Sequence, residues 1–543
     1  MIARRSFLIM VTQATSAIMG VVGLFVLAKC WGEFATTALG VIGFGMASIG
    51  MFSFLMNMGF DSAHIKRVSE GQDLGRCIGT FLAIKLVLTG CMIAAVFGSL
   101  AIWTYVLHQG IYDATKESAL YLFMGVYVLL SLAQVPTFTF VARREIAKHR
   151  ISETMEALTR VPLAVLVVLA GVTGAYVGTS ALNPIDIPPR YPWPEILQPI
   201  QEFLAAHAIG ALTTTYLIGA AAVFITAYIM FRRYPIKRPT REFAKSYLAF
   251  AAPMMVVQVI AVISINLDKV LLGYFWIAEE VGYYFAAQRL ATLVMMFSTA
   301  AGVVLFPTIS SFHTEERFDD IRHTTHSVER YVSMLITPLV IFMILFSDEI
   351  IAIFLTSSFH SADSLRILSL YVLFNTLSMP YAYVIQGMDR PGLLAKIFVI
   401  GYGINICLNL LFIPANGILS PWGVLGASGA AAASAISMLL ICIGLRIGAE
   451  RVAGFRAFQA RVVHHFCAAI LAALALHLFR LLLNPLRWYH LLGLTLIGLG
   501  IYLAVLWAIG EFRRGELKLI LDTINPRGII QYIKSELKGK GES

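Results

Sequence analysis

Fourteen apolar runs, each about 20 residues long, constrain this chain more than any other feature of its sequence. A helix of that length crosses the hydrocarbon core of a bilayer, and the continuity of the runs disfavours a β-barrel, whose strands alternate apolar and polar residues. The runs lie at 6–28, 37–58, 78–103, 118–141, 157–178, 209–231, 247–272, 282–306, 331–355, 366–386, 394–414, 425–445, 464–484 and 489–510. The sequence therefore predicts an all-α polytopic membrane protein with 14 transmembrane helices.

Composition supports a membrane protein and excludes several other classes. Apolar residues make up 58% of the 543 residues and charged residues 13%; charged residues usually form about a quarter of a soluble domain. None of the six cysteines forms a CxxC pair, and the chain has no GxxxxGK[ST] or HExxH motif, so we expect no metal and no other cofactor. We interpret the net charge of +10 as basic loops that face an anionic leaflet, not as nucleic-acid binding.

The basic residues predict how the spans are oriented. Fourteen spans place both termini on one side, and the loops of that side carry 31 of the 41 lysines and arginines, against six on the other side. The positive-inside rule therefore predicts a cell-membrane protein with both termini in the cytoplasm. The remaining four basic residues lie inside spans and are Lys85, Arg160, Lys269 and Arg289.

Linker composition predicts how the spans are grouped. The loop at 232–245 has six basic residues and separates the first six spans from the next six. We expect an N-terminal lobe at 1–240, a C-terminal lobe at 241–455, two additional helices at 456–512 and a cytoplasmic amphipathic tail at 513–543. The loop at 179–208 holds six of the nineteen prolines and predicts a stiff cap or a short interfacial helix.

Three runs, in this order and spacing, resemble a known family. They are NMGFDSAHIKRVSEGQD at 57–73, VGYYFAAQRL at 281–290, and LNLLFIPANG followed by GVLGASGAAAAS across 408–434. On these residues the chain resembles the polysaccharide-exporter family of oligosaccharide flippases, within the multidrug, oligosaccharidyl-lipid and polysaccharide exporter superfamily. The resemblance implies two six-helix lobes, a central cavity, and movement of a polyprenyl-phosphate-linked or diphosphate-linked oligosaccharide from the inner to the outer leaflet by alternating access. The first span lacks the charged pattern of the lipid II flippase branch, which disfavours that branch.

Charged side chains inside the predicted spans form the candidate site. A charge at that depth costs at least a few kcal/mol, so it is expected to face protein or water. Lys85, Arg160, Lys269 and Arg289, with Asp268, leave a net positive site that would attract the phosphate of a lipid-linked sugar. Asp268 and Arg289 lie at matched depth, so a static ion pair between them is an alternative, as is an ion-coupling role for Asp268. Lys85 and Arg160 snorkelling inward, and Lys269 outward, is the other alternative.

Neutral polar residues extend the candidate site. Asn405 and Asn409 lie one turn apart on one face of a predicted helix, and Ser264 lies in the same predicted helix as Asp268. Such groups either hydrogen-bond sugar hydroxyls or join helices to each other. The sequence leaves both roles open.

The leading hypothesis for function is a monomeric flippase of lipid-linked oligosaccharides, used in the synthesis of cell-surface polysaccharide, lipopolysaccharide or another glycan. We expect it to use the membrane potential or an H⁺ or Na⁺ gradient, and to catalyse no covalent reaction. An ion-coupled multidrug-type exporter is the first alternative, although a cavity for cationic drugs should be acidic. A membrane glycosyltransferase or ligase is the weaker alternative, because the 179–208 loop is too small for an outer catalytic domain.

Overall fold

The computed structural model contains only helices and the segments that connect them in the part of the chain that it describes. That part comprises residues 2–106, 114–143, 145–172, 193–295, 305, 308–355, 359–418, 421, 425–456, 459–482 and 488–511. Eleven of the described helices are long and apolar enough to cross a membrane. The predicted all-α class is therefore confirmed. Each of the fourteen predicted runs overlaps a described helix, but the count of fourteen stays a prediction.

The described part of the chain contains eighteen α-helices. Their order is α1 (Ile2–Trp31), α2 (Phe34–Met51), α3 (Phe54–Asn57), α4 (Phe60–Ser69), α5 (Leu74–Ala101), α6 (Ala114–Ala142), α7 (Ile146–Ala170), α8 (Gln198–Ala206), α9 (Ala208–Phe231), α10 (Arg241–Phe275), α11 (Ala278–Leu293), α13 (Phe318–Leu345), α14 (Ser347–Phe354), α15 (Ala362–Gly387), α16 (Pro391–Phe412), α17 (Gly426–Ala453), α18 (Ala460–Leu482) and α19 (Trp488–Ala508).

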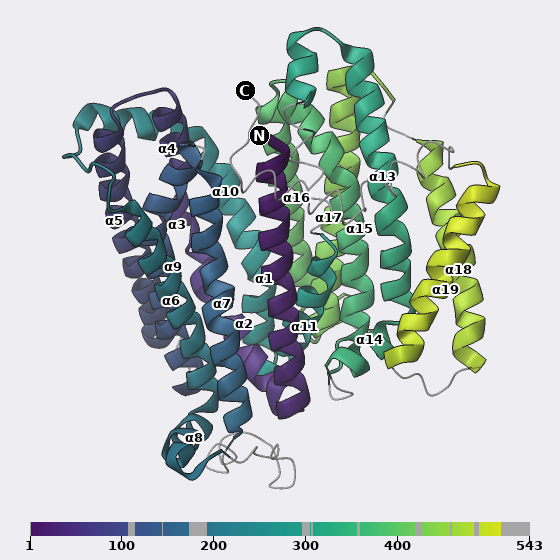
Figure 1. Ribbon diagram of the computed structural model, residues 1–543, viewed down its shortest axis with the longest axis horizontal. Coiled ribbons are helices and arrows are strands. Elements are labelled where there is room, and N and C mark those ends of the chain that lie inside the picture. Colours follow the sequence, from purple (N-terminus) through teal and green to yellow (C-terminus); the bar gives the residue numbers. More distant parts are fainter. Residues whose placement is uncertain are drawn as a thin grey trace, which may run out of the picture.

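The helices form two groups that lie side by side (Figure 1). In the first group, α9 packs against α6 and α7, α7 packs against α1, and α2 packs against α6. In the second group, α15 and α16 pack against α17, and α13 packs against α15. The last pair, α18 and α19, packs on α13 at the edge of the second group (Figure 1).

Helix α10 contacts both groups. Near its start, the hydroxyl of Tyr247 lies 2.9 Å from Nδ1 of the buried His64 in α4. Near its end, Ser264 donates to the side chain of Asn405 in α16 at 2.7 Å. Just beyond it, the indole N–H of Trp276 donates to a backbone carbonyl of the second group at 2.7 Å. One continuous helix of 35 residues therefore links the two cores.

The closest contact between the groups joins α2 to α11, near the end of the bundle where α1 ends. A Cβ atom added to Gly40 would lie 1.8 Å from the carbonyl oxygen of Ala278, and one added to Gly282 would lie 2.1 Å from that of Thr36. Only glycine permits such an approach of two backbones. Thr37 also donates to the carboxylate of Glu279 across this contact at 2.7 Å.

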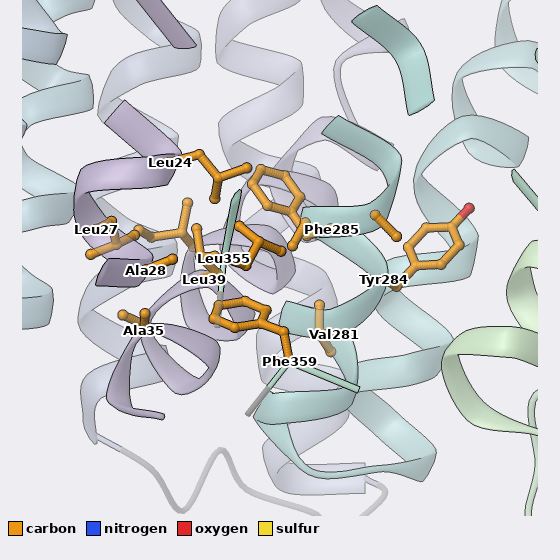
Figure 2. Packing of buried hydrophobic residues seen from close by; sticks show 14 of the residues in the cluster. Leu24, Leu27, Ala28, Ala35, Leu39, Val281, Tyr284, Phe285, Leu355 and Phe359 are labelled. Atoms are coloured by element: carbon orange, nitrogen blue, oxygen red, sulfur yellow. The ribbon is translucent and has the colours of Figure 1, made fainter. Parts of the chain in front are cut away.

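Apolar side chains continue the same contact along α1. Figure 2 shows Leu24, Leu27 and Leu39 facing Phe285 and Phe359, all of which are buried. The buried apolar cluster that they form extends from α1 and α2 to α11 and the segment after α14. The bundle is therefore closed at this end.

Two predicted segments lie partly or wholly outside the described residues. The tail at 513–543 lies outside them. Of the 179–208 loop, the structure describes the part from residue 193 onward, where α8 forms a short helix next to α7. Gln201 of α8 donates to the backbone carbonyl of Ala170 at 3.4 Å, while Phe203 is largely exposed.

Candidate functional site

A cavity of about 340 Å³ lies between α1, α2, α7, α9 and α11. Small residues of α1 leave room for it, since nothing lies within 4 Å of a Cβ added to Gly20. Most of its wall is apolar, and its charged side chains are few. The charged and aromatic side chains that line it are Glu156, Arg160, Tyr216, Phe285 and Arg289.

Arg160 is the shielded cation of this cavity. It follows Glu156 by one turn of α7, so the two side chains lie on one face, and its Nε donates to the Glu156 carboxylate. The guanidinium also stacks on the ring of Tyr216 in α9, with 4.6 Å between its central carbon and the ring centroid. The cation is thus held in place and partly neutralised.

Arg289 is the cation of the cavity that keeps its charge available. Its guanidinium carbon lies 4.9 Å from the ring centroid of Phe285, one turn earlier in α11. Among the described residues, no carboxylate lies within 4.0 Å of its nitrogen atoms. Arg289 is exposed, and it lines the same cavity as Arg160. Two arginines and one glutamate give the cavity a net positive charge.

An apolar groove of about 1120 Å³ adjoins the cavity. It runs between α1, α11, α13, α14 and α19, and Val21 and Leu293 line both spaces. Lys29 is the charged residue on its wall. Several lining side chains are exposed at its rim, including Phe25, Phe354 and Leu492. A hydrocarbon chain in this groove could therefore reach lipid without leaving apolar surroundings.

The prediction of an ion pair between Asp268 and Arg289 is wrong. Asp268 instead pairs with Lys269, at 3.0 Å between Oδ1 and Nζ, and accepts from the hydroxyl of Tyr284 at 2.5 Å. Equal depth in the membrane places Asp268 and Arg289 at the same level, but it does not determine where each side chain points around its helix. Arg289 lies five residues after Tyr284, so it points about 140° away around α11. Figure 2 shows the Tyr284 hydroxyl directed away from the apolar contact on which Phe285 lies.

The alternative that Lys269 snorkels outward does not match the structure either. Its long side chain folds back toward the aspartate and donates to the carbonyl of Ile265 at 3.0 Å and to the side chain of Gln288 at 3.3 Å. Lys269 is buried and does not snorkel outward. A flexible four-carbon stem allows this geometry, although the Cβ atoms of neighbouring helical residues diverge.

The two asparagines belong to a polar cluster that is separate from the cavity. Asn409 donates to the side-chain oxygen of Asn405 at 3.1 Å, and the same oxygen accepts from Ser264. Both asparagines are buried. Asn405 lines a small space of about 60 Å³, which also contains Asp268 and Tyr284 and is too small for a sugar. The geometry thus matches the role of joining helices.

Lys85 does not reach the cavity and does not snorkel. Its side chain is 0% exposed, and Nζ lies 2.7 Å from Oδ1 of Asp61 in α4. Asp61 was not predicted as a site residue, because its run at 57–73 follows the end of an apolar run. In the structure this run contains a helix break, where Met58 and Gly59 have φ values of 41° and 78°. The NMG triplet beside an acidic residue was the available signal.

Comparisons with known proteins find similarity to a polysaccharide-biosynthesis family model and to a glycan flippase. A family model described as "Polysaccharide biosynthesis protein" matches residues 202–364. A probable low-salt glycan biosynthesis flippase, Agl15 of Haloferax volcanii, is 23% identical over 437 residues, which are 80% of this chain and 81% of that protein. The predicted resemblance is confirmed.

Solved structures give the fold. The lipid II flippase MurJ, in an inward closed conformation, has a TM-score of 0.66 at 13% identity and covers 91% of this chain and 97% of its own. An inward-facing multidrug transporter of the MATE family has a TM-score of 0.59 at 13% identity, with 81% of this chain and 95% of its own covered. At such identities the likeness shows the fold alone. The expectation about the lipid II branch therefore stays a prediction.

The corrected pairing predicts which charges are coupled. Asp268→Asn leaves the Lys269 ammonium buried without its partner, so we expect it to lower the free energy of unfolding by about 3–5 kcal/mol. Asp268→Asn with Lys269→Met should recover at least about 1 kcal/mol relative to the sum of the single changes. Thermal or denaturant unfolding of the purified protein measures both.

A second cycle is the matched control. Asp268→Asn and Arg289→Gln should be additive within about 0.5 kcal/mol, because these residues do not touch. A large coupling energy in this cycle, with none in the first, would restore the pair that the sequence predicted.

Proposed function

We propose that this protein is a flippase that moves a polyprenyl-phosphate-linked or diphosphate-linked oligosaccharide across the membrane, for the synthesis of a cell-surface glycan. One observation carries the proposal: the cationic cavity and the apolar groove share Val21 and Leu293 as a common wall. A lipid-linked sugar has an anionic head and a long hydrocarbon tail, and adjoining spaces of these two kinds fit one such molecule. The relatedness to glycan flippases supports the same function.

Arg289 is the proposed phosphate-binding residue. Its guanidinium has no carboxylate partner among the described side chains, so phosphate does not have to displace one. Arg160 is the proposed second contact, weakened by Glu156. A guanidinium donates two parallel hydrogen bonds to phosphate oxygens, and such charge-assisted bonds are stronger than hydrogen bonds between neutral groups.

The contact between α2 and α11 supports alternating access. It closes one end of the bundle around Gly40 and Gly282. In the orientation that the basic loops predict, this closed end lies outside the cell, and the described state would open toward the cytoplasm. Separation of α2 from α11 would then release the oligosaccharide to the outer leaflet.

The alternatives explain less of the geometry. A cavity for cationic drugs would be acidic, whereas this one is net positive. A glycosyltransferase or ligase needs reacting side chains, and the described part of the cavity offers one carboxylate, already paired with Arg160. We therefore propose transport without covalent chemistry by a monomer. We also propose H⁺ or Na⁺ coupling. Neither Asp61 nor Asp268 is available to bind the coupling ion in this state, since each is paired with a lysine.

Charge in the cavity should control flipping. We expect Arg289→Gln to reduce the flipping rate by at least about tenfold, because a charge-assisted hydrogen bond contributes about 1.5–3 kcal/mol. Arg289→Lys should keep partial activity, and Arg160→Gln should have the smaller effect. The measurement is the appearance of a fluorescent lipid-linked oligosaccharide in the opposite leaflet of proteoliposomes.

Arg317→Gln is the control for this series, since it removes an exposed, paired arginine that does not line the cavity. Normal flipping by the variant that carries both Arg160→Gln and Arg289→Gln would contradict the proposed phosphate site.

The groove should determine the response to tail length. Leu339→Trp fills part of the groove, so it should slow the flipping of a substrate with a full-length prenyl chain several-fold. A short-chain analogue should be flipped at the rate of the unaltered protein. Leu478→Trp is the matched control, because Leu478 is 64% exposed on α18 and does not line the groove. Equal slowing of both substrates would argue against a tail site.

The membrane topology decides which side of the membrane the closed end of the bundle faces. A reporter fused after Ser543, or inserted at 232–245, should report the cytoplasm, and one inserted at 183–200 should report the exterior. An external C-terminus would reverse the assignment of the closed end.

A further inference from the structure

The first helix group contains a helix break, and one backbone carbonyl beside this break faces a buried charge. Helix α3 ends at Asn57, and Met58 and Gly59 adopt left-handed conformations before α4 begins. This break ends the hydrogen-bond ladder of α3 and leaves the carbonyl of Met56 free to accept from a side chain. In membrane transporters, unwound backbone of this kind commonly coordinates a free cation.

Here four oxygen atoms surround the ammonium of Lys85, which comes from α5. Nζ donates to the carbonyl of Met56 at 3.0 Å, to Oδ1 of Asn57 at 3.1 Å and to Oε1 of Gln134 at 2.5 Å. The carboxylate of Asp61 lies 2.7 Å away. We call these four oxygen ligands the Lys85 cage. They come from α3, α4 and α6, and together they carry a single negative charge.

The cage is built as a cation site is built. It combines one carboxylate with three neutral oxygens, all at hydrogen-bond distance from one point. A lysine ammonium has three N–H groups for these four oxygens, whereas a free ammonium ion has four. The ring of Phe81, with its centroid 5.3 Å from Nζ, borders the site as an aromatic face that also favours a cation.

A similar set of ligands surrounds Lys269 in the second part of the chain. There the ammonium meets the carboxylate of Asp268, the carbonyl of Ile265 and the side-chain oxygen of Gln288. Each lysine thus contacts one carboxylate, one backbone carbonyl and one glutamine. The Lys85 set differs because it lies at a helix break and its carboxylate comes from another helix.

We propose that the Lys85 cage is a monovalent-cation site that the chain fills with its own lysine. Removal of the side chain beyond Cβ leaves a space that fits propylammonium, and the single negative charge of the cage is then without a cation. The cage then binds a small free monovalent cation. The tethered cation holds the broken helix to α5 and α6. It also leaves the cage of the intact protein without room for a free coupling ion.

The test compares the full-length purified protein in salts of equal ionic strength. In choline chloride, whose cation is too large for the cage, Lys85→Ala should melt at least about 5 °C below the unaltered protein, since the carboxylate of Asp61, 15% exposed, is left without a counter-charge. Propylammonium chloride or ammonium chloride should raise that midpoint in a saturable manner. The measurement needs no substrate, so its result is independent of the proposed flipping.

Three proteins serve as controls. For each of them, the melting temperature should not depend on which salt is present. They are the unaltered protein, Lys66→Ala, which removes a lysine with a half-exposed side chain in α4, and the double variant with Asp61→Asn and Lys85→Met, which has no charge in the cage. A Lys85→Ala midpoint that responds to the salts only as the unaltered protein does would overturn the proposal. Failure of Lys85→Ala to fold in every salt would overturn it too, because a free cation would then not fill the cage.

Discussion

The cost of placing a charge inside a membrane determines how this bundle is organised. Each of the buried lysines that the sequence analysis placed within spans has an aspartate as its partner, at 2.7 Å for Lys85 and 3.0 Å for Lys269. Arg160 has Glu156. These pairs keep the charged groups of the helix cores compensated, so each core can be buried without a net charge. Arg289 is different: among the described residues it has no carboxylate partner and lies over the ring of Phe285, and this difference singles it out as the proposed phosphate-binding residue.

Helix α11 connects the site to the second core. One of its faces carries Phe285 and Arg289 toward the cavity, and another carries Tyr284 and Gln288 toward α10. Its first turn forms the close contact with α2 through Gly282. The helix that bears the free cation is therefore also the helix that closes the bundle. Opening of that contact would displace Arg289 relative to α1 and α7, so the proposed phosphate site would change shape as the bundle opens.

The sequence predicted the class of fold better than it predicted the contacts. Hydropathy and length are properties of single segments, and all fourteen predicted runs overlap helices. Arg160 and Arg289 were predicted as site residues and do line one cavity. Lys85, Lys269 and the two asparagines lie elsewhere, because depth in a span carries no information about the direction of a side chain around its helix. Asp61 was missed because a helix break hides a membrane segment from a hydropathy reading.

The last two helices supply one wall of the apolar groove, which is the proposed site of the hydrocarbon tail. Tyr489, Leu491, Leu492 and Thr495 of α19 line the apolar groove, opposite residues of α1. Three contacts on α13 hold this wall: the hydroxyl of Tyr502 donates to the carbonyl of Met334 at 2.9 Å, Ser333 lies 2.7 Å from His465, and Arg330 pairs with Glu511 at 2.7 Å. A bundle without α18 and α19 would keep the cationic cavity but expose α13 and α14 to lipid. These two helices therefore convert an open face into a groove, in which the hydrocarbon tail would lie on the proposed mechanism.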